Sequence, residues 1–152
     1  MKNSLLLSLA LMTAMPVAAA KLSMPSDAPK SYEAECASCH MAYQPGLLGQ
    51  KNWLNIMANL GKHFGSDASL DDKTQSEISK WLIKNASSDR KYSALAPENR
   101  ITKSAWFIKE HDEVKAEVWT RPSVKSAANC TACHTDAATG DFSERKIRIP
   151  VK

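Results

Sequence analysis

The chain has 152 residues, of which 20 are Lys or Arg and 16 are Asp or Glu, so its net charge is +4. This mild charge, without an Arg-rich face interleaved with aromatic residues, excludes a typical nucleic-acid-binding protein. The length suffices for one domain or two very small ones. With only three Phe, three Tyr and four Trp, the core made by protein alone is expected to be modest, and a bound cofactor could supply the missing apolar mass.

Residues 1–20 are expected to be a cleaved secretory signal peptide. Lys2 precedes a leucine-rich apolar run, which ends in the small residues Ala18, Ala19 and Ala20. The alternative is a membrane anchor, but the apolar run is short for a span of about 20 residues. No later segment is apolar enough to cross a bilayer. The mature protein is therefore expected to be exported, to the periplasm in a bacterial cell, with no integral membrane segment.

A first, N-terminal domain is predicted over residues 21–85, after a polar arm. A first helix is expected over 31–43, ended by the Gln-Pro-Gly sequence at 44–46. A second helix is predicted over about 50–60, because its apolar residues recur with the helical period. These residues are Trp53, Ile56, Met57 and Leu60.

A third helix is predicted after Ser69, which is expected to be its N-terminal cap. Asp71 and Asp72 would lie in its first turn, where negative charge favours the helix dipole. The residues expected on its buried face are Ile78, Trp81 and Leu82. The polar stretch 86–100 is predicted to link the two halves.

A second, C-terminal domain is predicted over residues 101–152. It is expected to hold a helix over about 102–118, a further helix around Cys130 and Cys133, and a short extended stretch near the C-terminus. The tail carries a basic run that could dock an acidic partner, although charge runs are usually solvated faces, which is the interpretation favoured here. This run consists of Arg145, Lys146 and Arg148.

All four cysteines lie in two Cys-x-x-Cys-His motifs. These motifs are formed by Cys36, Cys39 and His40, and by Cys130, Cys133 and His134. On a helix, residues three apart lie one turn apart on the same face, so both thiols can reach the edge of one porphyrin. The histidine that follows can then bind the iron. The motifs therefore predict two covalently attached haem c groups, which makes residues 21–85 the N-terminal haem domain and residues 101–152 the C-terminal haem domain.

Two other interpretations of the cysteine pairs are open. Four thiolates could form a tetrahedral zinc site, and each pair could be a redox-active disulfide. Neither interpretation explains why a histidine follows each pair, and no βαβ pattern surrounds either pair. The haem interpretation is favoured for that reason.

The histidine count matches the number of axial ligands that two six-coordinate irons need. Beyond His40 and His134, the chain has only His63 and His111. His63 follows the apolar face of the second helix, and His111 lies four residues after Phe107, on the same helical face. We expect bis-histidine ligation at both haems, with His63 serving the first and His111 the second. A spare histidine is, however, more often a surface or core residue than a ligand.

Methionine is the rival axial ligand. After removal of the leader, Met24, Met41 and Met57 remain, and Met57 is the main alternative at the first haem. Met41 is adjacent to a proximal histidine, and Met57 fits the apolar stripe of a helix, which favours core packing. No methionine follows Met57, so the second haem has little choice beyond His111.

Two imidazoles on each iron predict low-spin haems of low potential that exclude small ligands. An electron-transfer protein rather than an enzyme is therefore expected. The alternative is a haem enzyme, a peroxidase or a small-oxyanion reductase, in which one haem has a labile ligand. A haem-based sensor is also conceivable, but the chain carries no output domain.

Five stretches spanning nearly the whole mature chain resemble the dihaem cytochrome c family of proteobacteria. They lie at residues 32–48, 52–70, 104–114, 129–134 and 140–150. The resemblance implies an all-α fold of two small haem-bearing halves, the first akin to class I cytochromes c. It implies a soluble periplasmic electron carrier whose partners are a membrane cytochrome b and a small oxygen-binding monohaem cytochrome. The family's axial positions match His63 and His111.

Overall fold

The computed structural model of the protein describes residues 22–151, which form an all-α fold, as predicted. Within this range the chain has no strand, only three isolated β-bridges. The α-helices are α1 (Lys30–Cys36), α2 (Gln50–Met57), α3 (Asp72–Asn85), α4 (Arg90–Ser93), α5 (Ala105–Glu110) and α6 (Ala116–Trp119). The 3₁₀ turns are η1 (Pro45–Leu47), η2 (Leu60–Lys62), η3 (Pro97–Asn99), η4 (Ile101–Lys103), η5 (Cys130–Ala132), η6 (Ala137–Thr139) and η7 (Glu144–Lys146).

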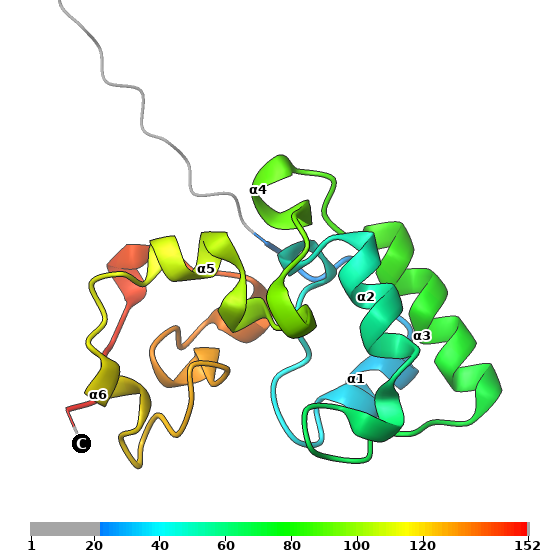
Figure 1. The fold of residues 1–152 in the computed structure, drawn as a ribbon, viewed down its shortest axis with the longest axis horizontal. Coiled ribbons are helices and arrows are strands. Elements are labelled where there is room, and N and C mark those ends of the chain that lie inside the picture. The colour runs from blue at the N-terminus through cyan, green and yellow to red at the C-terminus, as the bar shows by residue number, and fades with distance from the viewer. Residues whose placement is uncertain (1–21, 152) are drawn as a thin grey trace, which may run out of the picture.

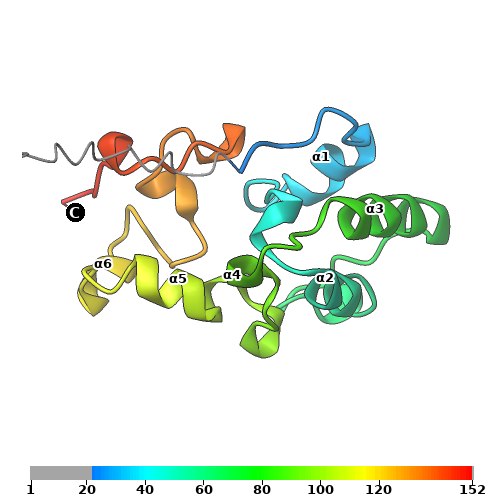
Figure 2. The same ribbon diagram turned by 90° about the horizontal axis from the view of Figure 1, so that it is seen from above.

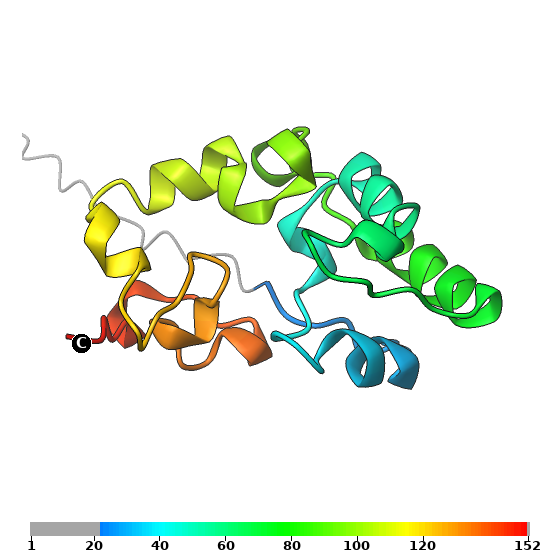
Figure 3. The same ribbon diagram turned by 60° about the horizontal axis from the view of Figure 1, so that its bottom comes forward.

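The helices gather in two groups (Figure 1). Helices α1, α2 and α3 lie at one end of the molecule, and α5, α6 and the C-terminal segment lie at the other (Figure 3). Seen from above, the C-terminal segment lies on the same side as α1, while α4, α5 and α6 follow the opposite edge (Figure 2). None of the helices within residues 22–151 is long and apolar enough to cross a membrane. The predicted signal peptide lies outside the described residues.

The core lies in the first group and depends mainly on packing between α2 and α3. Its buried members are Tyr32, Leu48, Trp53, Met57, Ile78, Trp81, Leu82 and Ala96. The apolar period of both helices therefore predicted their buried faces correctly. Gly49, just before α2, allows close approach of the chain, since a Cβ there would lie 2.5 Å from the Ser93 carbonyl oxygen.

The N-terminal cap of α3 is Asp71, so the assignment of this role to Ser69 was wrong. The Asp71 carboxylate accepts hydrogen bonds from the backbone N–H groups of Lys73 and Thr74, each at 3.1 Å. Ser69 instead lies in the preceding turn, where its backbone N–H donates to Asp67. A carboxylate directly before the helix satisfies two otherwise unpaired donors and also favours the helix dipole.

We expect Asp71→Ala to lower the free energy of unfolding of the holoprotein by about 1 kcal/mol, because it removes this cap. Urea unfolding followed by circular dichroism measures the change. Ser69→Ala is the matched control and should stay within about 0.5 kcal/mol of the wild type. A larger loss at Ser69 than at Asp71 would contradict the assignment.

The first haem helix is shorter than the predicted 31–43. Helix α1 ends at Cys36, and Cys39 and His40 follow in an irregular turn. The Ser38 hydroxyl donates to the Glu35 carbonyl oxygen at 3.0 Å, and a continued helix would need that carbonyl for the backbone N–H of Cys39. Such side-chain bonds compete with helical ones. The second motif likewise forms the single 3₁₀ turn η5 instead of a full helix.

The single helix predicted over 102–118 was also wrong. The chain forms η4, α5 and α6 there, with a turn between α5 and α6. Helix α5 ends where the His111 ring folds back, because its Nδ1 atom hydrogen-bonds the Phe107 carbonyl oxygen at 2.9 Å. That carbonyl would otherwise accept the backbone N–H of His111.

The segment 86–100, predicted to be a linker, contains α4 and η3 and packs closely against the first group of helices. Ala96 is 3% exposed, and its carbonyl oxygen accepts a hydrogen bond from the Asn52 side chain at 3.3 Å. The Asp89 carboxylate caps α4 by accepting from the backbone N–H of Lys91. The boundaries proposed for the two haem domains remain a prediction.

Residues 147–150 form the extended stretch that the tail pattern indicated. Ile147 makes an isolated antiparallel bridge with His134, and the backbone N–H of Arg148 donates to the Cys133 carbonyl oxygen at 2.9 Å. Lys146 pairs with Asp136 and Asp141 at 2.6 and 2.8 Å. The tail therefore folds over the second Cys-x-x-Cys-His motif.

Candidate haem sites

The first candidate site brings together His40 and His63, which are 23 positions apart in the chain. His40 follows α1, and His63 follows η2 at the end of the α2 segment. Their ring centroids are 6.1 Å apart, and the ring planes are inclined by 29°. The Tyr43 ring stacks on the His40 ring at 4.7 Å.

The second candidate site brings together His111, at the end of α5, and His134, just after η5. Their ring centroids are also 6.1 Å apart, with the ring planes at 79°. The His111 ring stacks on the buried Phe107 ring at 4.0 Å and lies 5.8 Å from Trp119. The Phe142 ring lies 5.5 Å from His134.

The equal separation in both pairs fits two imidazoles on opposite sides of one metal ion. A metal–imidazole bond is about 2 Å long and each nitrogen lies roughly 1 Å from its ring centre, which puts such ring centres about 6 Å apart. Both pairs therefore have the spacing that bis-histidine ligation of an iron requires.

One histidine of each pair has its orientation fixed by a backbone carbonyl. The Nδ1 atom of His40 lies 2.7 Å from the Met41 carbonyl oxygen, and that of His111 lies 2.9 Å from the Phe107 carbonyl oxygen. Since a carbonyl only accepts, each Nδ1 donates in this bond, and the tautomer that makes it has its lone pair on Nε2, where a metal can bind.

The other histidine of each pair is biased toward the neutral form. Burial lowers the pKa of His63, with smaller contributions from His40 and Arg100, and burial beside His111 lowers the pKa of His134. The Nδ1 atom of His134 is buried without a hydrogen-bond partner. Neutral imidazole is the form that binds metals.

None of the four cysteines forms a disulfide, and Cys39 and Cys133 directly precede His40 and His134 in the chain. Burial raises the pKa of the Cys36 thiol to about 11, with a smaller contribution from Glu35, and burial also raises that of Cys130 to about 11. Within residues 22–151, which include all four cysteines, no three His, Cys, Asp or Glu side chains gather as a metal site would need. The four-thiolate zinc arrangement is therefore not formed.

The chain is similar to known proteins over most of its length. The sequence profile described as dihaem cytochrome c matches residues 32–142. The crystal structure of a dihaem c-type cytochrome from Shewanella baltica OS155 is 38% identical, with a TM-score of 0.71, over 80% of this chain and 93% of that chain.

The chain belongs to the dihaem cytochrome c family.

Two structures of the Rhodobacter sphaeroides dihaem cytochrome c are also similar. They are 38% and 35% identical, with TM-scores of 0.67 and 0.68, over 78% and 79% of this chain and 99% of each of those chains. A search of curated protein sequences found no match. As a dihaem cytochrome c, the chain carries two covalently attached haem c groups and is a c-type electron carrier.

Sequence reasoning missed two adjacent residues that connect the two haem sites of this dihaem cytochrome c. The Tyr43 hydroxyl donates to the Ala128 carbonyl oxygen at 2.6 Å, two residues before the second motif. The Gln44 side chain is fully buried, and its Nε2 atom donates to the Ala137 carbonyl oxygen at 2.7 Å. The only signal in the sequence was a polar residue before Pro-Gly, which indicates a turn.

Met57, the rival ligand, packs in the core. It is 5% exposed and belongs to the cluster between α2 and α3. The Gln75 side chain donates to its carbonyl oxygen at 2.7 Å, which fixes the end of α2 against α3. Core packing accounts for this methionine in the dihaem cytochrome c fold.

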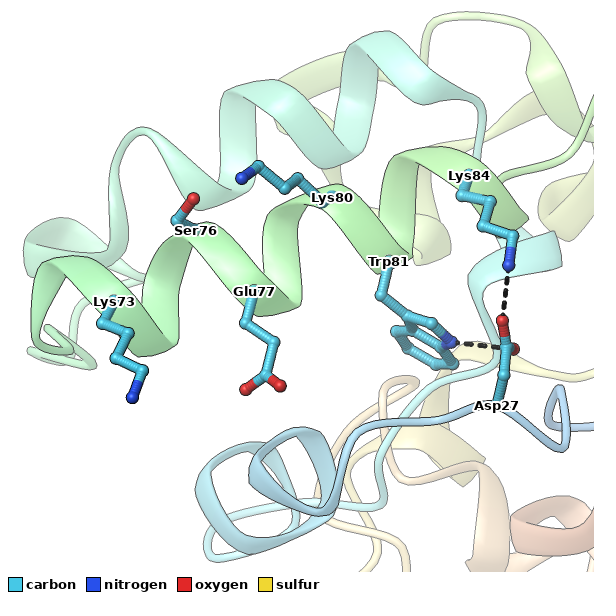
Figure 4. Close-up of a pocket in the computed structure, with 7 residues that line it drawn as sticks. All are labelled: Asp27, Lys73, Ser76, Glu77, Lys80, Trp81 and Lys84. Carbon is cyan, nitrogen blue, oxygen red and sulfur yellow. Dashed lines mark hydrogen bonds and ion pairs between the residues drawn. The ribbon is translucent and has the colours of Figure 1, made fainter.

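A groove with a volume of about 540 Å³ lies on α3 (Figure 4). Asp27 bridges it at one end, since its carboxylate pairs with Lys84 at 2.7 Å and accepts from the Trp81 indole at 3.2 Å. None of the predicted haem ligands lines this groove. It is therefore separate from the haem sites.

Proposed function

We propose that this dihaem cytochrome c transfers electrons in the periplasm between a membrane cytochrome b and a small monohaem cytochrome. In this proposal His40 and His63 ligate the first haem, and His111 and His134 ligate the second. Cys36, Cys39, Cys130 and Cys133 form the thioether links. The observation that carries the ligand assignment is the 6.1 Å separation of the rings in both histidine pairs.

When bound, each haem supplies one-electron chemistry at its iron. The chain contributes fixed ligands, since Nδ1 of His40 and Nδ1 of His111 donate to backbone carbonyls. Around His111, the rings of Phe107 and Trp119 pack against the imidazole. With two histidines assigned to each haem, the bound irons would have no coordination position left for a substrate. This favours electron transfer over bond chemistry.

The proposed partners and location are supported by the resemblance of five segments to the family and by the leader at residues 1–20. The described residues add electrostatic detail. Lys146 is neutralised by Asp136 and Asp141, so of the basic tail residues Arg145 and Arg148 remain for an acidic partner. Electrostatic attraction of this kind raises association rates and weakens with salt.

The resting protein from the periplasmic fraction is expected to begin at Lys21 and to show two low-spin ferric signals by electron paramagnetic resonance. Low-spin states follow because strong-field imidazoles fill both axial positions. The signals should differ, since the ring planes meet at 29° in one pair and 79° in the other. A high-spin resting haem, or a carbon monoxide complex formed at once on reduction, would instead favour the peroxidase or reductase alternative.

The partner assignment is tested by stopped-flow mixing of the reduced protein with an oxidised small monohaem cytochrome. Oxidation should be second-order and slower at high ionic strength. An oxidation rate no faster than that with an unrelated c-type cytochrome would contradict the proposed partner but not the bis-histidine assignment.

A further inference from the structure

The two distal histidines, His63 and His111, are held in different ways. His111 ends a helix, hydrogen-bonds a helical carbonyl and stacks on a buried ring. His63 lies on an exposed loop between η2 and α3, and neither of its ring nitrogens has a hydrogen-bond partner within residues 22–151. The two haem sites therefore differ in how firmly the chain fixes the sixth ligand.

The backbone directly after His63 is strained. Phe64 has φ +52° and Gly65 has φ +103°, both in the left-handed region. Glycine adopts this region freely, but a residue with a Cβ atom does so at a cost. Phe64 is also 43% exposed, so burial does not compensate for its conformation. The turn itself is closed by the backbone N–H of Ser66, which donates to the His63 carbonyl oxygen at 3.0 Å. That bond fixes the backbone, whereas the position of the exposed Phe64 ring depends on contacts with neighbouring side chains.

One such contact comes from Arg100. Its guanidinium carbon lies 4.3 Å from the centroid of the Phe64 ring, and the Phe64 ring in turn packs on the His63 ring at 4.7 Å. A guanidinium over an aromatic face is an attractive cation–π contact. Arg100 therefore contacts His63 indirectly, through the ring of Phe64.

Arg100 reaches the loop from a segment that is itself anchored. The Asn99 side-chain oxygen accepts hydrogen bonds from Asn52 and Asn55 of α2, each at 3.1 Å, and Asn52 is fully buried. Glu98 pairs with the Arg100 guanidinium at 3.4 Å. The contact between Arg100 and Phe64 therefore joins an anchored segment, residues 98–100 packed on α2, to an exposed segment, the His63 loop.

Space for movement lies beside the loop. A hollow of about 190 Å³ is lined by His63, Phe64, Asn55, Asn59 and Asn99, among others. If the Phe64 ring moves away from the Arg100 guanidinium, it can enter this hollow or the solvent beside the loop. The loop can then relax without disturbing the core between α2 and α3.

We propose that Arg100 is a positioning residue that latches the His63 loop through Phe64 and so keeps the first haem closed to small neutral ligands such as carbon monoxide. The inference rests on the proposed ligation by His63. On opening, His63 leaves as neutral imidazole and one neutral ligand replaces it, so no electron or proton is transferred. The second haem, with His111 fixed by Phe107, stays closed.

The experiment measures the rate of carbon monoxide binding to the dithionite-reduced holoprotein at one fixed carbon monoxide concentration. Arg100→Ala is expected to raise this rate roughly five- to thirtyfold, because the loss of one cation–π contact raises the open fraction by that factor. The amplitude should correspond to one haem of two. Arg90→Ala, which removes an exposed positive charge from the same segment, is the matched control and should leave the rate unchanged.

Phe64→Leu breaks the same contact from the other side and keeps the test valid if Arg100→Ala does not fold. If both variants retain two haems, the double variant should bind carbon monoxide no faster than the faster single variant. Each single variant already removes the cation–π contact between Arg100 and Phe64, so the second substitution has no such contact left to remove. Arg100→Lys keeps the charge without the planar group, so its rate of carbon monoxide binding should lie between those of the wild type and Arg100→Ala.

His63→Ala supplies the fully open reference and separates two failures. If His63→Ala leaves both haems low-spin and closed, the proposed ligation is wrong. If His63→Ala opens one haem but neither Arg100→Ala nor Phe64→Leu changes the rate, the ligation stands and the latch is overturned. Additive effects in the double variant would also overturn it.

Discussion

The double variant Cys130→Ala/Cys133→Ala is expected to carry one haem and to leave residues 101–151 unfolded, while the first group of helices stays folded. The second half has little apolar core of its own. Its buried apolar side chains are Phe107, Val118, Val124 and Ala137. Its longest helix, α5, has six residues, too few to be stable without packing partners. Folding of this half therefore depends on its covalent cofactor, by the logic of metal-coupled folding.

Haem stoichiometry by pyridine haemochrome and amide hydrogen exchange by mass spectrometry measure the two effects. Exchange within residues 101–151 should approach that of an unfolded chain, whereas α2 and α3 should remain protected. The matched control is Cys36→Ala/Cys39→Ala, which removes the first haem but leaves the eight-residue core cluster intact. Protection of α5 in the protein lacking the second haem would contradict this dependence.

The helices that the sequence predicted best are those held by protein packing alone. Trp53 and Met57 on α2, and Ile78, Trp81 and Leu82 on α3, recur with the helical period and are all buried. The elements predicted worst lie beside the haem sites. There the hydroxyl of Ser38 and the ring of His111 take up helical carbonyls, which periodicity does not register.

The residue types of the candidate sites could be predicted, but their support could not. Four histidines for four axial positions is an arithmetic argument that needs no fold. By contrast, the bonds from Tyr43 to Ala128 and from Gln44 to Ala137 join residues 85 and 93 positions apart. Such contacts depend on how the two halves dock, and local patterns in the sequence carry no information about docking.

The variant His111→Met is expected to raise the reduction potential of one haem by on the order of 0.1 V and to leave the other unchanged. A thioether is a weaker donor than imidazole and stabilises ferrous over ferric iron. The Phe107 ring that stacks on His111 at 4.0 Å leaves an apolar surface that a methionine side chain can cover. Potentiometric titration followed at the α-band measures both potentials in one sample.

The matched variant His63→Met should change the reduction potential of the other haem, because the His63 ring pairs with His40 and not with His134. The size of the two effects should also differ. Methionine at 63 gains no helical support, since the residue lies on the exposed loop held by Arg100 and Phe64, so part of the sample should become high-spin. Methionine at 111 loses the ring hydrogen bond to Phe107 but still follows α5 directly and lies beside the Phe107 and Trp119 rings, so it should remain low-spin. If both variants changed the same haem, the assignment of His63 and His111 to different haems would be wrong.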